Sequence, residues 1–133
     1  MIETDIELLA IAESDVQESA GGAMVRARLN KTPSGQWLTC LDDALKTSTR
    51  ELLGGDPPKY DFLERRQPAL AFGVARGKAA AKLEAVAEVV AHANAAARQI
   101  NEQVASDQRL ALEKIEQQRA DFAEIKKELL HKK

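Results

Sequence analysis

Apolar residues recur at spacings of three and four along the last part of the chain, which is the pattern of an amphipathic helix. From Lys78 to Lys133 there is neither glycine nor proline, and good helix formers such as Ala, Glu, Lys, Gln and Leu dominate. The pattern therefore predicts one long helix over residues 78–133. About 52 helical residues would span roughly 78 Å, whereas a compact chain of this length has a radius of gyration of about 14 Å. We expect the helix either to project or to be broken.

The apolar positions of this helix follow a heptad without a miss from Leu83 to Val104. The register then meets polar residues, and apolar side chains return to it at Phe122. An eleven-residue relation, as between Val104 and Ile115, describes this crossing better than a strict repeat of seven. We therefore expect a stutter in the supercoil near residues 105–115.

An isolated helix of this length would leave its apolar stripe in water, so the stripe predicts association with a second copy of the chain, with a dimer favoured. The alternative is that Ser106 and Asp107 cap a new helix that folds back within one chain as an antiparallel hairpin. The predicted oligomer interface consists of Leu83, Val86, Val90, Ala93, Ala97, Ile100, Val104, Ile115, Phe122, Ile125 and Leu129.

The first segment of the chain supports two different secondary structures. Thr4 and Glu7 fit a capping box, and apolar residues follow at roughly helical spacing, which predicts a short helix over residues 4–19. The alternation of Ile6, Leu8 and Ala10 favours a strand instead. Residues 23–30 alternate between apolar and polar side chains and predict a half-buried strand.

Glycine and proline residues separate the predicted helices and strands in the middle of the chain. A helix is predicted over residues 34–53, with a stop at Gly54 and Gly55. Residues 59–64 and 69–74 predict two short strands that form a hairpin. The sequence therefore predicts an α+β fold in two parts. A small domain over residues 1–77 carries about three short strands and two helices, and a coiled-coil helix follows over residues 78–133.

The amino-acid composition excludes several classes of protein. The chain has 133 residues and a formal net charge of −2, with 44% hydrophobic and only 4% aromatic residues, which suits one lean core rather than a multi-pocket enzyme. The single cysteine, Cys40, excludes an intrachain disulfide and a multi-cysteine metal site. No apolar run is long enough for a membrane span and no signal peptide is evident, so we expect a cytoplasmic protein, of a composition compatible with a bacterial or phage origin.

Charge is spread unevenly along the chain. Residues 1–20 carry six acids and no base, whereas residues 59–82 carry six bases against two acids. A basic surface of this kind predicts contact with nucleic acid through phosphates, or neutralisation of the chain's own acidic N-terminus. The residues that would form it are Arg26, Arg28, Lys31, Arg65, Arg66, Arg76, Lys78 and Lys82.

Candidate catalytic groups do not form a set. His92 and His131 lie about 58 Å apart on a straight helix, so they cannot share a site within one chain. Cys40 is followed closely by Asp42 and Asp43, and neighbouring acids oppose formation of a thiolate nucleophile. No phosphate-binding loop is present. We expect no enzyme activity, no cofactor and no metal.

Two hypotheses for function follow from these patterns. The first is a non-enzymatic oligomeric adaptor or inhibitor that presents its small domain to a protein partner. The second is a small nucleic-acid-binding regulator or accessory factor that uses the basic segments over residues 26–31 and 65–82.

Overall fold

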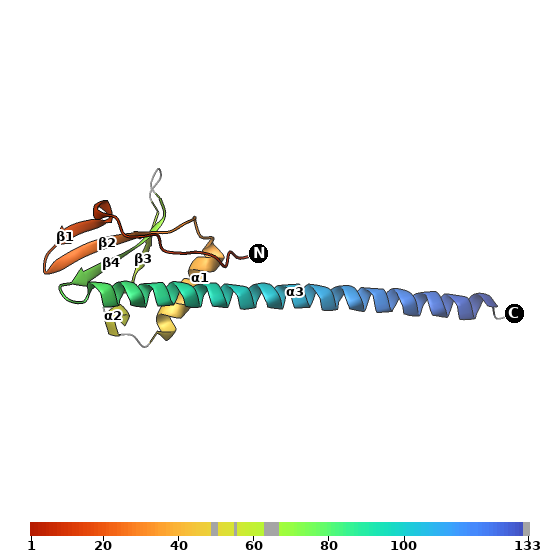
Figure 1. The fold of residues 1–133 in the computed structure, drawn as a ribbon. Helices are drawn as coiled ribbons and strands as arrows, with labels where there is room; N and C mark the ends of the chain where they lie inside the picture. Colours follow the sequence, from red (N-terminus) through yellow and green to blue (C-terminus); the bar gives the residue numbers. More distant parts are fainter. Residues whose placement is uncertain (49–50, 55, 63–66, 132–133) are drawn as a thin grey trace. The chain divides into compact units, whose positions relative to one another are not determined.

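A computed structural model describes residues 1–48, 51–54, 56–62 and 67–131 of the chain. It divides into two compact units, Met1–Arg98 and Gln99–Lys133. The first unit carries a four-stranded antiparallel sheet with helices, and the predicted α+β class is confirmed (Figure 1). The division at Arg98 differs from the predicted boundary at residue 77, because the first turns of the long helix belong to the core of the small domain.

The sheet has the strand order β1-β2-β4-β3, with every neighbouring pair antiparallel. Its strands are β1 (Val16–Ser19), β2 (Gly22–Arg28), β3 (Lys59–Asp61) and β4 (Ala69–Ala75). The three predicted strands correspond to β2, β3 and β4. In β2, Val25 and Ala27 point into the core while Met24 is exposed, as the alternation of the sequence predicted.

The predicted helix over residues 4–19 is wrong. This segment runs in an extended form beside the end of β2, then forms a 3₁₀ turn, η1 (Glu13–Asp15), and strand β1. Leu9 N–H donates to Arg28 O at 2.7 Å, and Asn30 N–H donates to Glu7 O at 3.0 Å. These bonds satisfy backbone groups that a helix would have paired locally, so tertiary pairing overrides the capping signal. The strand alternative is right about the extended backbone, although only Leu8 forms a bridge, with Leu29.

The predicted helix over residues 34–53 is shorter than expected. Helix α1 (Gly35–Thr47) begins after Ser34, whose hydroxyl oxygen accepts from Trp37 N–H at 3.2 Å and so caps the helix. It ends six residues early, and a separate turn, α2 (Glu51–Gly54), follows. One face of α1 enters the core through Trp37, Cys40 and Leu41.

The long helix is confirmed as α3 (Ala79–His131). It begins after Gly77, whose φ of +79° suits glycine. The helix continues through Ser106 and Asp107, so the alternative of a fold-back hairpin is wrong. Across the described residues, no helix has both the length and the apolar character needed to cross a membrane.

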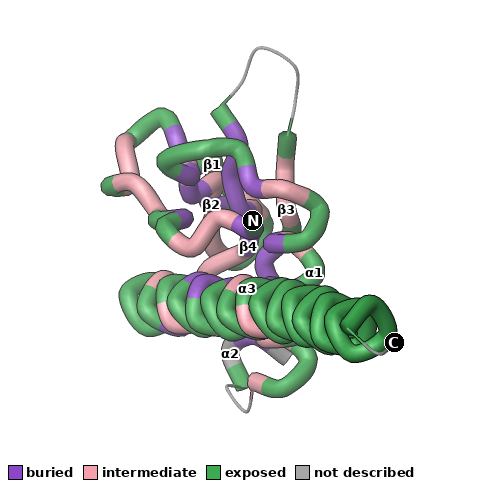
Figure 2. Tube along the Cα trace, turned by 90° about the vertical axis from the view of Figure 1, so that its right-hand side faces the viewer, coloured by how far each residue is buried: buried purple, intermediate pink, exposed green. Residues whose placement is uncertain are grey.

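The core of the first unit lies between the sheet, α1 and the first turns of α3. Figure 2 shows buried positions on the strands and on this part of α3. The largest fully buried side chains are Trp37, Phe72, Ile6, Leu29, Leu70, Val86 and Val89.

A buried amide ties three parts of this core together. Asn94 on α3 donates through Nδ2 to Ile6 O at 2.8 Å. Its Oδ1 accepts from the Trp37 indole at 2.9 Å and from Ile6 N–H at 3.3 Å. One side chain thus fixes the N-terminal segment and α1 against α3.

Candidate functional site

The predicted oligomer interface divides into a covered and an exposed part. Within the first unit, Val86, Val90, Ala93 and Ala97 are buried, and Leu83 packs against the same core. The apolar surface of the four buried residues is already covered by the chain itself, so the prediction that these four meet a second copy is corrected, whereas Leu83 is only partly buried. The apolar residues in the first half of the heptad pack in one core with the sheet and α1 of the same chain.

In the second unit, the remaining interface residues are all exposed. At about 100° per residue, these residues and Ala111 fall within an arc of about 80° on the helix surface. We call this surface the helix stripe, and it consists of Ile100, Val104, Ala111, Ile115, Phe122, Ile125 and Leu129. The Phe122 side chain is 67% exposed and Ile115 is 46% exposed. Exposed apolar patches of this kind occur where proteins bind other proteins, membranes or ligands.

Three residues of the predicted basic surface form ion pairs within the first unit. Arg28 Nε pairs with Asp15 Oδ2 at 3.0 Å, and Lys31 Nζ pairs with Asp5 Oδ2 at 2.7 Å. Both acids belong to the acidic N-terminal segment, as the alternative interpretation of the basic residues predicted. Arg26 Nε pairs with Asp61 Oδ2 at 2.9 Å.

The other predicted basic residues differ in their surroundings. Lys82 is only 4% exposed, and its ammonium donates to Asp56 O at 2.6 Å. Arg76 and Lys78 are exposed at the turn before α3. Arg65 and Arg66 lie outside the described residues. Among the basic residues that the structure describes, Arg26, Arg28 and Lys31 are thus paired with carboxylates, whereas Arg76 and Lys78 are exposed.

Asp15 is the most tightly held of these acids. Burial by itself would raise the pKa of the Asp15 carboxyl, but the hydrogen bond from Ala12 N–H and the Arg28 guanidinium outweigh it. The pKa of Asp15 is therefore lowered from its ordinary value. The ion pair with Arg28 fastens the N-terminal segment to strand β2.

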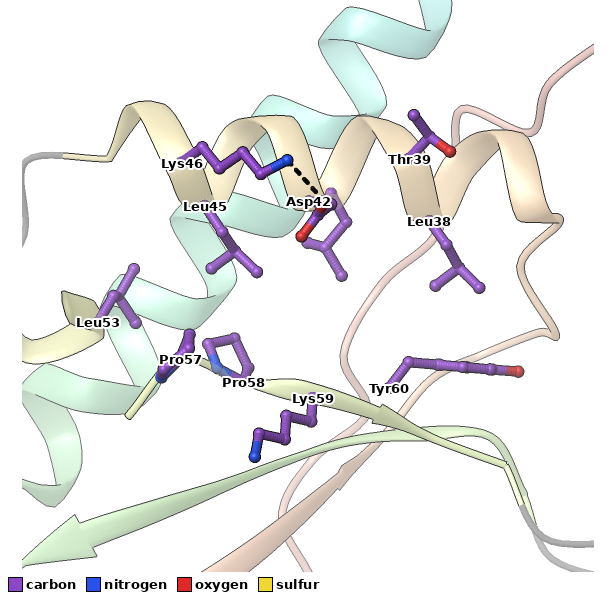
Figure 3. Close-up of a pocket in the computed structure, with 11 residues that line it drawn as sticks. Leu38, Thr39, Asp42, Leu45, Lys46, Leu53, Pro57, Pro58, Lys59 and Tyr60 are labelled. Atoms are coloured by element: carbon purple, nitrogen blue, oxygen red, sulfur yellow. Dashed lines mark ion pairs between the residues drawn. The ribbon is translucent and has the colours of Figure 1, made fainter. Parts of the chain in front are cut away.

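A groove between α1 and strand β3 was not predicted from the sequence. It has a volume of about 650 Å³ and is lined mainly by apolar side chains of α1, the Pro57–Pro58 segment and β3 (Figure 3). Leu38 and Leu45 project into it from α1, and the Tyr60 ring forms part of its floor. Because β3 is an edge strand, the groove also borders an edge of the sheet, and none of the described strands pairs with this edge.

The polar residues that line the groove are Thr39, Asp42, Lys46, Lys59 and Tyr60. Lys46 Nζ pairs with Asp42 Oδ2 at 3.2 Å on the exposed side of α1. Burial raises the pKa of the Tyr60 hydroxyl, which keeps the ring neutral near pH 7. The groove therefore suits an apolar segment rather than a charged small molecule.

The remaining candidate groups do not assemble into a reactive centre. Burial, followed by the charge of Asp43, raises the pKa of the Cys40 thiol and disfavours the thiolate. His92 and His131 are both exposed on α3. In the described part of the chain, no three His, Cys, Asp or Glu side chains come together in a way that would hold a metal ion.

No known protein family, curated protein or solved structure matches the chain.

Proposed function

We propose that the chain is a non-enzymatic interaction protein. Residues 99–131 of α3 join copies of the chain, and the small α+β domain is presented to a protein partner. The observation that carries this proposal is the helix stripe, which is exposed along its whole length in the second unit. A single helix in water gains no packing for such a stripe, and association with another helix would bury it.

The size of the stripe supports association. Completely burying a Leu, Ile, Val or Phe side chain is worth roughly 1.5–3 kcal/mol. Six large apolar side chains lie on the stripe, so even partial burial of each supplies several kcal/mol toward binding. Ala111 adds little area but allows two helix backbones to approach closely.

Thermal unfolding at several protein concentrations tests this proposal. Association stabilises the folded form by mass action, so the midpoint of unfolding, followed by far-UV circular dichroism, should rise with concentration. The double variant Ile115→Asp, Phe122→Asp should lose this dependence. Leu110→Asp is the matched control, because Leu110 is also exposed and lies about 100° from the centre of the stripe. A midpoint that is independent of concentration in the native chain would contradict the proposal.

The groove between α1 and β3 is the surface of the small domain that best suits a protein partner. An extended segment could pair with the open edge of β3 while apolar side chains fill the space beside Leu38 and Leu45. Placing a large charged side chain in the groove should therefore weaken partner binding without disturbing the core.

The chain offers a matched pair of threonines for this test. Thr39 lines the groove, whereas Thr47 does not, and both are exposed on α1 with hydroxyls that donate to the helix backbone at 3.1 Å. A stoichiometric protein that copurifies with the native chain should be lost with Thr39→Arg and kept with Thr47→Arg. Equal retention by both variants would remove the groove from the proposal.

Nucleic-acid binding is the weaker proposal. Arg26, Arg28 and Lys31 already have carboxylate partners, and Lys82 is buried. Binding of phosphates would have to displace these intramolecular pairs, which lowers the affinity that the basic residues can supply.

A further inference from the structure

Over residues 111–129, the face of α3 that carries the helix stripe contains two rows of residues that repeat every seven positions, and these rows include Gln118. On a coiled coil these rows occupy the two core positions, a and d. The a row is Ile115, Phe122 and Leu129, and the d row is Ala111, Gln118 and Ile125. Among these six positions, Gln118 is the single polar residue.

Gln118 distinguishes between the two possible orientations of a second helix. In a parallel dimer in register, d residues face d residues, so each Gln118 amide meets its own copy and the two can exchange a hydrogen bond. In an antiparallel dimer, d residues face a residues. If the two copies overlap over residues 111–129, Gln118 of one copy therefore lies against Ile115 or Phe122 of the other. An amide buried against apolar side chains without a partner is costly.

The charges beside the stripe favour the same orientation. One flank, position e, carries Arg119 and Lys126 and no acid, whereas the other flank, position g, carries Asp121 and Glu128 together with Lys114. Parallel helices bring g of one copy against e of the other. Antiparallel helices bring e against e, which sets the basic flank against itself.

From these relationships we infer that the partner of the helix stripe is a second copy of this chain, aligned parallel and in register over residues 108–131. The inference rests on the proposed function, which supplies the association itself. It assigns Gln118 as the residue that sets register, and it pairs Asp121 of one copy with Lys126 of the other. The Lys114 and Arg119 contact between copies is the one unfavourable pair of this arrangement.

Disulfide cross-linking tests the orientation. Ala111→Cys and Ile125→Cys each place a thiol in the d row, and they lie about 21 Å apart along the helix. In a parallel dimer each position lies beside its own copy, within reach of a disulfide, so each variant should cross-link with itself under mild oxidation. The native chain is the control, because its single thiol, Cys40, is buried.

Each outcome separates the inference from the proposed function. Self-cross-linking at both positions supports the parallel dimer. In an antiparallel dimer d residues face a residues, and only one position of a helix can meet its own copy. A solution mass of two chains without self-cross-linking at both positions would therefore overturn the inference and leave the association standing. Absence of cross-links together with a solution mass of one chain would contradict both.

A charge exchange provides a second test that needs no new thiol. Asp121→Lys should weaken the dimer about two- to tenfold, because two pairs per dimer turn from attraction to repulsion. Adding Lys126→Asp to the same chain should restore the affinity, since residues five apart on one helix do not face each other. If the double variant is no tighter than the single one, the parallel pairing is wrong.

Discussion

The Trp37 indole N–H donates to the Asn94 side-chain oxygen at 2.9 Å, and both groups are buried. The same amide also bonds both backbone groups of Ile6. Three segments that are distant in the sequence therefore meet at one polar side chain inside an apolar core. This arrangement fixes how α1 and the N-terminal segment sit on the first turns of α3.

Replacing Asn94 should destabilise the small domain strongly. Asn94→Ala leaves the Trp37 indole and the Ile6 backbone groups buried without partners, which should cost about 2–4 kcal/mol of unfolding free energy. Gln99→Ala is the control on the same helix, because Gln99 is exposed, and its effect should stay within about 0.5 kcal/mol. Urea unfolding followed by Trp37 fluorescence measures both. Equal effects would show that the amide network contributes nothing specific.

The ion pair of Asp15 with Arg28 predicts a pH dependence of stability. Because folding lowers the pKa of Asp15 from its ordinary value of 3.8, the carboxylate contributes stability above that value and loses it as the pH falls through the lowered pKa. At pH 7, Asp15→Asn should therefore cost about 1 kcal/mol of unfolding free energy. The difference from the native chain should shrink steadily below about pH 4.

Urea unfolding at several pH values measures this effect. Asp42→Asn is the control, because Asp42 forms an exposed pair with Lys46 and such pairs are worth little. A loss for Asp15→Asn that stays constant down to the lowest pH would contradict the role assigned to the charge of Asp15.

Gln118 should hold the dimer in one alignment at the expense of affinity. Gln118→Leu replaces an amide layer by an apolar one, so the dimer should become tighter by about 1–2 kcal/mol while its alignment becomes less specific. Sedimentation equilibrium measures the affinity, and cross-linking of Ala111→Cys in the same background measures the alignment. A weaker dimer with unchanged alignment would show that Gln118 does not set the register.

Reversing the charge of Lys114 should increase the affinity between the two copies. Lys114→Glu should tighten a parallel dimer about two- to tenfold, because the contact with Arg119 of the other copy changes from repulsive to attractive. In an antiparallel dimer the same change should weaken association, since Lys114 would then face acids of the opposite g row. Lys127→Glu, on the far side of the helix from the stripe, is the control for the change of net charge.

The long helix could be predicted because the evidence for it is local. The absence of glycine and proline after Lys78 and the choice of helix formers act within a few residues of each position. The partner of its apolar face could not be predicted in the same way. Apolar residues at spacings of three and four produce the same sequence pattern in two different cases. The helix face can cover a sheet, as at Val86, or it can meet another helix.

The N-terminal segment and the groove depend on contacts between distant parts of the chain. Thr4 and Glu7 fit a helix start, yet the bond from Leu9 N–H to Arg28 O draws this segment into an extended form. The groove combines α1 with the edge strand β3, and no local pattern places these two elements side by side. The sequence did contain an indication of the role of Asn94, because this residue is a single amide among the small apolar residues of the predicted oligomer interface.

The central claim is that the helix stripe joins copies of the chain, and sedimentation equilibrium of the intact chain tests it most directly. Measured near pH 7 over a range of micromolar concentrations, the mass should approach twice 14.5 kDa, and the Ile115→Asp, Phe122→Asp variant should remain at the mass of one chain. A native chain that stays at the mass of one chain throughout this range would contradict the claim.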